Sequence, residues 1–475
     1  MPESQTMTAD QKTPPGLQVF LDRIKGVLAQ DVIELDLSAT PFDDLAPVKA
    51  LVNLERLDIS GTKVADISPL EALPQIRELD LSGTVITDAS SIAWLRNLKR
   101  LNLEGTGIRK ISALSRLAGL EELNLRDTQV ANISPLEDLR NLKTVDLRGT
   151  KVKKTAPLTA SCACLEKLDV QGSRVKDISL LSWFRNLKEL NISETDISDI
   201  YPLRELSHLE ILDAHQTDIA DISVLRELDQ LTELDIRKTR VVDATPVASL
   251  VNLKKLYLSR IEDFSLLKPL INLERLDLSD TGISDLSPLL HLTNLTELSL
   301  RNTPVSDISA ITAFKDLKKL DIWNTEVTDF TPLRQMKGLE VLNLGRTAIT
   351  DLSPLRALHS LKELTLWNTA VRNLQPLASL KVLERLNLRD TRISDLSALE
   401  QLENLKELNI GYTNVMYLNP LEKLYALEKL DVRDTYVKNV SPLSSLERMR
   451  ELILIDSKVE NLMPLRHLKH LRVKL

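Results

Sequence analysis

The sequence is poor in cysteine, histidine and aromatic residues. Its 475 residues include two cysteines and six histidines, and 3% of them are aromatic. Two cysteines exclude the disulfide framework of small secreted modules and favour a reducing compartment. No stretch approaches the roughly 20 apolar residues of a membrane-spanning helix, and the first residues lack the apolar core of a secretion signal. We therefore expect a soluble, cytoplasmic chain with no membrane partner.

The chain also lacks an excess of basic charge. It carries 61 Lys and Arg against 68 Asp and Glu, which gives a formal net charge of −7. A nucleic-acid-binding surface needs a basic face, so we expect no nucleic-acid partner. The histidines match no metalloprotease or nucleophile motif, and Cys162 with Cys164 lacks the further ligands of a zinc site. We expect no enzyme activity, no metal site and no cofactor.

The chain repeats one motif at a fixed period. The stretch Asn272–Thr293, NLERLDLSDTGISDLSPLLHLT, recurs about every 22 residues, and twenty copies follow one another from Asp31. Self-similarity of this kind is the signature of a repeat architecture, in which each unit packs only on its neighbours. The sequence therefore predicts one elongated domain.

Each copy predicts a short strand and a short return segment. Leu276 and Leu278 lie on one side of the strand and face inward, while Asp277 faces outward. Ser287 before Pro288 offers a capping hydroxyl and a first helical residue. Stacked copies predict an α/β solenoid, an arc with a parallel β-sheet on its concave face and short 3₁₀ or α segments on its convex face. A threonine after each strand is expected to bond a backbone group through its hydroxyl, as a buried ladder; its members include Thr62, Thr84, Thr128, Thr281, Thr303 and Thr391.

The domain organisation follows from where the motif begins and ends. Residues 1–16 are polar and have nothing to bury, so we expect a disordered tail. Residues 17–30 place apolar side chains at helical spacing and predict a cap helix over the first strand. The solenoid fills residues 31–475 and ends in a partial strand. One copy carries an extra residue near Cys162, and the copy from Asn252 lacks two residues, so the curvature is expected to change at both.

The pattern resembles the 22-residue class of leucine-rich repeats, which is found in bacterial internalins and in a regulatory subunit of the type-one protein phosphatase. The resemblance covers Asp31 to Lys469. It implies the solenoid fold and, since family members mostly bind proteins on the concave face, a protein partner there. Internalins typically add secretion and wall-attachment segments, and none is evident in this sequence.

Charged residues occupy equivalent positions in successive copies, and we call each such set of positions a column. Most of the alternating charges are interpreted as pairs between neighbouring strands; the two alternating columns include Glu55, Arg77, Lys99, Glu121, Lys143, Glu166, Lys188 and Glu210, and Glu34, Arg56, Glu78, Arg100 and Glu122. Aspartates form two more columns, Asp36, Asp58, Asp80, Asp146, Asp169, Asp213 and Asp235, and Asp66, Asp88, Asp177, Asp199 and Asp221. Calcium-binding solenoids add glycine-rich turns that are missing here, so we interpret the second aspartate column as turn caps.

One column changes character along the chain and predicts the partner-binding site. Early copies carry Ser38, Ser60 and Ser82 two residues after the strand aspartate, whereas later copies carry aromatic and basic residues. Tryptophan, tyrosine and arginine dominate interface energetics. With two residues from the adjacent column, the predicted site comprises Arg301, Trp323, Gly345, Arg346, Trp367, Arg389, Tyr412 and Arg433. Trp323 and Trp367 are expected to wall a slot whose floor is Gly345, and Tyr257, Arg260 and His215 are the fallback positions.

These observations predict a bacterial protein-binding scaffold that recognises a partner protein on its concave face. The alternative is an exported effector or adhesin-like protein that engages a host protein after secretion by a non-Sec route. Self-association is also expected through the C-terminal edge, because Ile453 and Ile455 replace polar strand residues there.

Overall fold

The computed structural model describes residues 15–475, so the predicted tail lies outside the described residues up to position 14. These residues form two compact units. Unit 1 runs to Leu231 and includes Lys238–Arg240, and unit 2 comprises Thr232–Arg237 and Val241–Leu475. The single solenoid domain over residues 31–475 stays a prediction.

Unit 1 begins with the α-helix α1, Pro15–Arg23, which starts earlier and ends sooner than the helix predicted over residues 17–30. Its described strands are β1 (Glu34–Asp36), β2 (Arg56–Asp58), β3 (Glu78–Asp80), β4 (Arg100–Asn102), β5 (Glu122–Asn124), β6 (Thr144–Asp146), β7 (Lys167–Asp169), β8 (Glu189–Asn191) and β9 (Ile211–Asp213). Its 3₁₀ helices are η1 (Ala29–Asp31), η2 (Ala46–Ala50), η3 (Ser68–Ala72), η4 (Ser90–Trp94), η5 (Ser112–Arg116), η6 (Ser134–Leu136), η7 (Ala156–Ser161), η8 (Ser179–Trp183), η9 (Tyr201–Glu205) and η10 (Ser223–Glu227).

Unit 2 repeats the same alternation. Its strands are β10 (Glu233–Asp235), β11 (Lys255–Tyr257), β12 (Arg275–Asp277), β13 (Glu297–Ser299), β14 (Lys319–Asp321), β15 (Val341–Asn343), β16 (Glu363–Thr365), β17 (Arg385–Asn387), β18 (Glu407–Asn409), β19 (Lys429–Asp431), β20 (Glu451–Ile453) and β21 (Arg472–Lys474). Its 3₁₀ helices are η11 (Thr245–Ser249), η12 (Phe264–Leu267), η13 (Ser287–Leu289), η14 (Ser309–Ala313), η15 (Thr331–Gln335), η16 (Ser353–Ala357), η17 (Gln375–Ser379), η18 (Ser397–Leu399), η19 (Asn419–Leu421), η20 (Ser441–Leu443) and η21 (Met463–Leu465).

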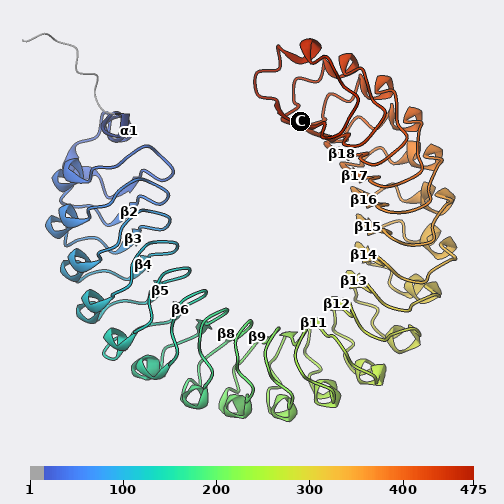
Figure 1. Ribbon diagram of the computed structural model, residues 1–475. Coiled ribbons are helices and arrows are strands. Elements are labelled where there is room, and N and C mark those ends of the chain that lie inside the picture. Colours follow the sequence, from blue (N-terminus) through green and yellow to red (C-terminus); the bar gives the residue numbers. More distant parts are fainter. Residues whose placement is uncertain (1–14) are drawn as a thin grey trace, which may run out of the picture. The chain divides into compact units, whose positions relative to one another are not determined.

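Within each unit, every strand pairs in parallel with the next copy of itself. Leu35 aligns with Leu57 in unit 1, and Leu276 aligns with Leu298 in unit 2. Both leucines of the pair in unit 2 are buried, as is Leu278. In each unit the strands line one side and the 3₁₀ helices line the opposite side (Figure 1). The expected solenoid, with a parallel sheet and short 3₁₀ segments, is confirmed.

The turns into the 3₁₀ helices are held by the second aspartate column. Asp285 Oδ1 accepts a hydrogen bond of 2.8 Å from the Ser287 backbone N–H, and Asp66 Oδ1 accepts the equivalent bond from Ser68. The interpretation of this column as turn caps is confirmed. The predicted capping role of the serine hydroxyl is wrong, because Ser287 is the first residue of η13 and its hydroxyl donates to the same Asp285 carboxylate.

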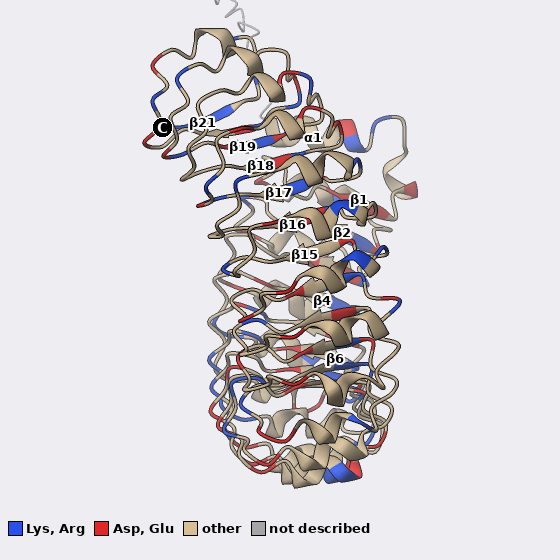
Figure 2. Ribbon diagram, turned by 90° about the vertical axis from the view of Figure 1, so that its right-hand side faces the viewer, with Lys and Arg blue, Asp and Glu red and all other residues tan. Residues whose placement is uncertain are grey.

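Charges on the strands pair with neighbouring strands, as predicted. Glu121 lies between Lys99 and Lys143, with distances of 3.0 and 2.7 Å to their ammonium groups. Hydrogen bonds from Lys143 and Lys99 lower the pKa of Glu121 to about 2. Basic and acidic residues are interspersed along the ribbon of each unit (Figure 2). Such exposed pairs align the strands and add little stability singly.

The irregular copies and the last strands differ from the regular pattern in limited ways. The extra residue near Cys162 lies at the end of η7, which has six residues, and both Cys162 and Cys164 are free thiols.

At the C-terminal end, β21 pairs with β20 and Ile453 is buried, so the prediction that Ile453 is uncovered is wrong. Ile455 remains 37% exposed, and self-association stays a prediction. Among the described helices, none has the length and apolar character to cross a membrane.

The threonine ladder is present and buried. Thr281 Oγ1 donates a hydrogen bond of 2.7 Å to the Leu278 carbonyl, three residues earlier, and Thr281 is 5% exposed. The equivalent bond joins Thr128 to Leu125 at 2.6 Å. Each hydroxyl therefore satisfies a backbone carbonyl of its own copy as the chain leaves the strand.

Thr281→Val is expected to lower the free energy of unfolding of unit 2 by about 1 kcal/mol, because the shape is kept while the Leu278 carbonyl loses its hydroxyl partner. Urea denaturation followed by circular dichroism measures the change. Thr281→Ser keeps the hydroxyl and is the control. An equal or larger loss in the serine variant would show that the methyl group, and not the hydrogen bond, matters.

The carboxyl of Asp169 should make stability depend on pH in the opposite direction to an ordinary paired aspartate. Burial raises the pKa of its carboxyl to about 6, despite hydrogen bonds from the Gln171 backbone and the Asn191 side chain. The folded state therefore holds a proton that the unfolded state, with a pKa near 3.9, has already released. The free energy of unfolding should fall as the pH rises from about 4 to about 6 and then level off.

Asp169→Asn removes this loss. The free energy of unfolding of the variant minus that of the parent should therefore be larger above pH 7 than at pH 4, by on the order of 2 kcal/mol. Urea midpoints at both pH values test it. The control is Asp66→Asn, because hydrogen bonds from Ser68 lower the pKa of Asp66 and its difference should run the other way. A pH-independent difference for Asp169→Asn would contradict the prediction.

Candidate functional site

The predicted site residues lie along unit 2, each in the turn that follows a strand. We call them the aromatic–arginine row: Arg301 after β13, Trp323 after β14, Gly345 and Arg346 after β15, Trp367 after β16, Arg389 after β17, Tyr412 after β18 and Arg433 after β19. The strand register places these turns side by side, because β13 to β19 pair consecutively in parallel. The row therefore follows one edge of the sheet across seven successive strands.

The first group in the row is built on a tryptophan pair. The indoles of Trp323 and Trp367 are stacked, with ring centroids 6.1 Å apart and planes inclined by 12°. Arg301 and Arg346 place their guanidinium carbons 4.9 and 5.3 Å from the Trp323 ring centroid. Both indoles are half-buried, and each cation–π contact contributes about 0.5–1 kcal/mol at an exposed position. The group thus presents a rigid aromatic surface bordered by cations.

Gly345 explains how indoles from strands two apart can stack. A Cβ atom on Gly345 would lie 2.7 Å from Trp323 Cδ1 and 3.2 Å from the Trp367 carbonyl oxygen. The Trp323 ring therefore rests on the glycine backbone. The predicted slot is wrong in its geometry, because a planar group between two rings needs about 7 Å of separation and these rings are closer. The available binding surface is the exposed part of the stack.

The second group lies on the next strands. Arg389 places its guanidinium carbon 4.7 Å from the ring centroid of Tyr412, which is 42% exposed. Arg433 packs on Gly411, where a Cβ atom would lie 2.8 Å from Arg433 Cγ, and its Nε donates to Asp431 at 2.9 Å. Gly411 thus carries a long side chain from the next turn, whereas Gly345 carries one from the preceding turn. The predicted residues therefore form two groups.

Two residues of the row occupy a backbone conformation that their side chains disfavour. Arg346 has φ of 53° and Tyr412 has φ of 58°. Left-handed backbone suits Gly, Asn and Asp, whereas a bulky side chain there is an outlier. The other left-handed residues described in unit 2 are Arg260, Asp280, Asn302, Asn324, Asn368, Asp390, Asp434 and Asp456. Arg346 and Tyr412 thus depart from the Asn and Asp that neighbouring copies use, and such strain is typical of functional positions.

Sequence reasoning missed that the carboxylate column is interrupted beneath this row. Strands β15 to β18 carry Asn343, Thr365, Asn387 and Asn409 where Asp321 and Asp431 stand on the flanking strands. The Asn387 Oδ1 still accepts from the Arg389 backbone N–H at 3.0 Å, as an aspartate would. The turn is kept and the negative charge is removed. Aligning the copies by column would have shown this interruption.

Two of the fallback positions, Tyr257 and His215, are held by contacts with neighbouring side chains. Tyr257 lies beneath Arg237, whose guanidinium carbon is 4.8 Å from the ring centroid, and its hydroxyl accepts from Arg275 at 3.2 Å. Arg237 also pairs with Asp277 at 2.9 Å. Arg260 is exposed in a left-handed turn. We interpret the Tyr257 group as structural.

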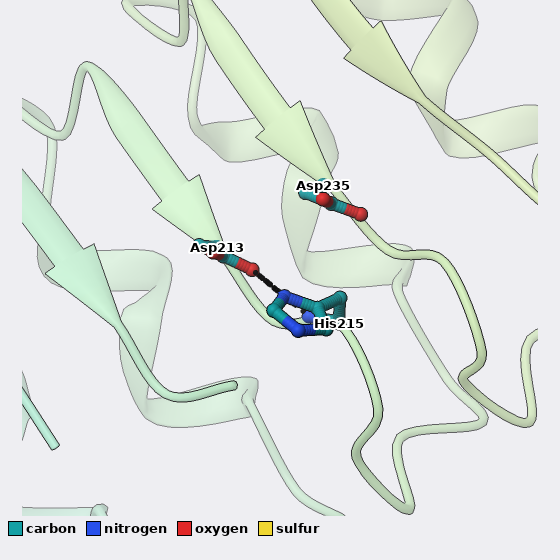
Figure 3. Close-up of side chains that lie close together, drawn as sticks. All are labelled: Asp213, His215 and Asp235. Atoms are coloured by element: carbon teal, nitrogen blue, oxygen red, sulfur yellow. Dashed lines mark hydrogen bonds and ion pairs between the residues drawn. The ribbon is translucent and has the colours of Figure 1, made fainter. Parts of the chain in front are cut away.

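His215 belongs to unit 1 and forms a local pair. Its Nδ1 lies 2.7 Å from Asp213 Oδ1, so the proton on Nδ1 is donated to the carboxylate (Figure 3). His215 Nε2 lies 3.6 Å from Glu194 Oε1. Asp235, which the figure also draws, belongs to unit 2. Within unit 1, His215 is therefore held between two carboxylates.

Comparisons with known proteins agree with this architecture. The family model described as Leucine Rich repeats (2 copies) matches residues 52–94, 271–313 and 315–357. A search of the curated proteins finds no match. The chain is 33% identical to internalin C2 of Listeria monocytogenes over 39% of its own length and 82% of that chain, with a TM-score of 0.38.

Two further solved structures are similar in fold. A leucine-rich repeat protein of Leptospira interrogans is 20% identical, with 98% of this chain and 100% of that chain covered and a TM-score of 0.51. The ectodomain of the plant receptor kinase GASSHO1/SCHENGEN3 from Arabidopsis thaliana, solved in complex with CASPARIAN STRIP INTEGRITY FACTOR 2, is 17% identical, with 94% and 67% covered and a TM-score of 0.59. The repeated motif, the stacked parallel strands and the matching family model agree, and the chain belongs to the leucine-rich repeat proteins.

Proposed function

We propose that this chain is a protein-binding scaffold whose partner contacts the aromatic–arginine row of unit 2. The observation that carries the proposal is the pair of strained positions in the row, Arg346 beside the stacked tryptophan pair and Tyr412 in the second group. Strained bulky residues lower stability, and an Asn at either position would fit the turn better. Their presence is explained by contacts that they make with another molecule.

The chemistry of the row also fits a protein partner. Trp, Tyr and Arg supply large contact areas with few rotatable bonds or with planar hydrogen-bonding groups, and truncating one at an interface hot spot costs about 2 kcal/mol or more. The tryptophan pair is held in place by Gly345, so little freedom is lost on binding. The Arabidopsis ectodomain of similar fold was solved in complex with another molecule, which supports the use of this fold in recognition.

The first test removes the tryptophan pair. A partner is captured from a lysate with the full chain, identified by mass spectrometry and purified, and its Kd is measured for the parent and for Trp323→Ala with Trp367→Ala. Affinity should fall well over tenfold, since two anchors are lost. Folding should be kept, because neither residue is one of the inward-facing leucines of the core.

The matched control removes two other indoles, Trp94→Ala with Trp183→Ala. These residues lie on η4 and η8 of unit 1 and are 52% and 59% exposed. The control variant should bind the partner as the parent does. Unchanged affinity in the folded Trp323 and Trp367 variant would refute the row as the binding site.

The second test separates strain from binding. Arg346→Asn and Tyr412→Asn each place a residue suited to left-handed backbone in the turn, so each should raise the free energy of unfolding by on the order of 0.5–1 kcal/mol while weakening partner capture. Urea midpoints and the partner Kd give the two readings. Asn324→Tyr, the reverse change in an equivalent turn, should lower stability. Lower stability in Tyr412→Asn would instead assign Tyr412 to packing.

A further inference from the structure

Two arginines of the row differ from the others in having no acidic partner. Within the part of the chain that the structure describes, Arg346 and Arg389 lie over aromatic rings and have no carboxylate within 4.0 Å. By contrast, Arg301 pairs with Asp321 at 3.2 Å, and Arg433 pairs with Asp431 at 2.9 Å. The guanidinium planes of the two unpaired arginines keep their hydrogen-bonding capacity for another molecule.

The missing partners follow from the interrupted carboxylate column. Arg433 follows Asp431 on its own strand and is bound by it, whereas Arg389 follows Asn387, whose side chain carries no charge. Arg346 likewise follows Asn343, whose Oδ1 accepts from the Gly345 backbone N–H at 3.1 Å. The amides therefore keep the turns closed while leaving both cations without counter-charges. A hollow of about 240 Å³ adjoins this stretch, over β16 to β19.

The distance between the two arginines constrains the spacing of the acidic groups in a ligand that would bind both. Their turns follow β15 and β17, two strands apart, and adjacent strands lie about 4.8 Å apart. The backbones of the two arginines therefore lie roughly 10 Å apart, with the half-buried Trp367 in the turn between them. An extended polyproline-type segment rises about 3.1 Å per residue and presents every third side chain on one face, so its side chains repeat at about 9 Å.

We propose that the partner of this row is an acidic extended protein segment whose carboxylates, three residues apart on one face, bind Arg346 and Arg389 on either side of Trp367. This inference rests on the proposed function of the same site. Arginine binds carboxylate through two parallel hydrogen bonds, and these are stronger than neutral ones. A continuous phosphate backbone fits less well, because the exposed carboxylate of Asp390 and the net charge of −7 repel any anionic ligand, and a nucleic-acid strand carries a charge on every residue whereas the proposed segment carries one in three.

The experiment measures fluorescence anisotropy of labelled peptides on the full-length chain at low salt. One peptide is made of four Glu-Pro-Leu repeats, and its control is made of four Gln-Pro-Leu repeats of the same length. The glutamate peptide should bind at least about tenfold more tightly, and its affinity should fall as salt is added. Arg346→Gln with Arg389→Gln should reduce its binding to the level of the glutamine peptide.

The control variant makes the same change of charge elsewhere in unit 2. Arg334→Gln with Arg356→Gln alters exposed arginines on η15 and η16 and should leave the glutamate peptide bound as in the parent. Equal affinity for both peptides, no measurable binding of either at millimolar concentration, or tighter binding of a single-stranded RNA of the same length would overturn the inference.

The outcome is distinguishable from failure of the proposed function. If the tryptophan variant loses the captured partner while the Arg346 and Arg389 variant keeps it, the row remains the binding site and its acidic ligand is refuted. If both variants keep the partner, the proposed function itself fails.

Discussion

The in-register parallel pairing of successive copies is the interaction on which each unit depends. Pairing of Leu276 with Leu298 keeps both leucines on the buried face, and a slip of one residue would turn every inward side chain toward solvent. The same register places the turn of one strand beside the turn of the next. Any side chain in a turn thus has neighbours 22 residues away, which is how a one-dimensional repeat becomes a continuous surface.

Because the leucines and the ladder threonines carry the fold, the turn after each strand is free to vary. In unit 1, Ser60 is followed by Gly61 and Ser82 by Gly83, and these glycines take the left-handed backbone of the turn without strain. In two turns of unit 2 the glycine stands one position earlier, at Gly345 and Gly411, and the left-handed position is occupied by Arg346 and Tyr412. The shift makes room for a neighbouring side chain at the cost of strain.

Charged side chains on the surface differ in whether a neighbouring side chain carries the opposite charge. Glu121 between Lys99 and Lys143 is neutralised by its neighbours, and its lowered pKa records that. Arg389 has the same formal charge as those lysines, but its own strand offers an amide where Arg433 has a carboxylate. Composition cannot reveal this difference, since both arginines belong to the same column. The local partner decides which cation remains available.

The sequence by itself determined the period, the inward leucines, the buried threonine bonds and the aspartate turn caps, because each follows from spacing within one copy. The tertiary structure decided what depends on neighbouring copies. The indoles of Trp323 and Trp367 come from strands two apart and close over Gly345, so the expected slot became a stack. Ile453 was expected to be uncovered but is buried, because β21 pairs with the strand that carries it. A repeat pattern gives each side chain its direction, whereas its rotamer and its partner depend on residues about 22 or 44 positions away.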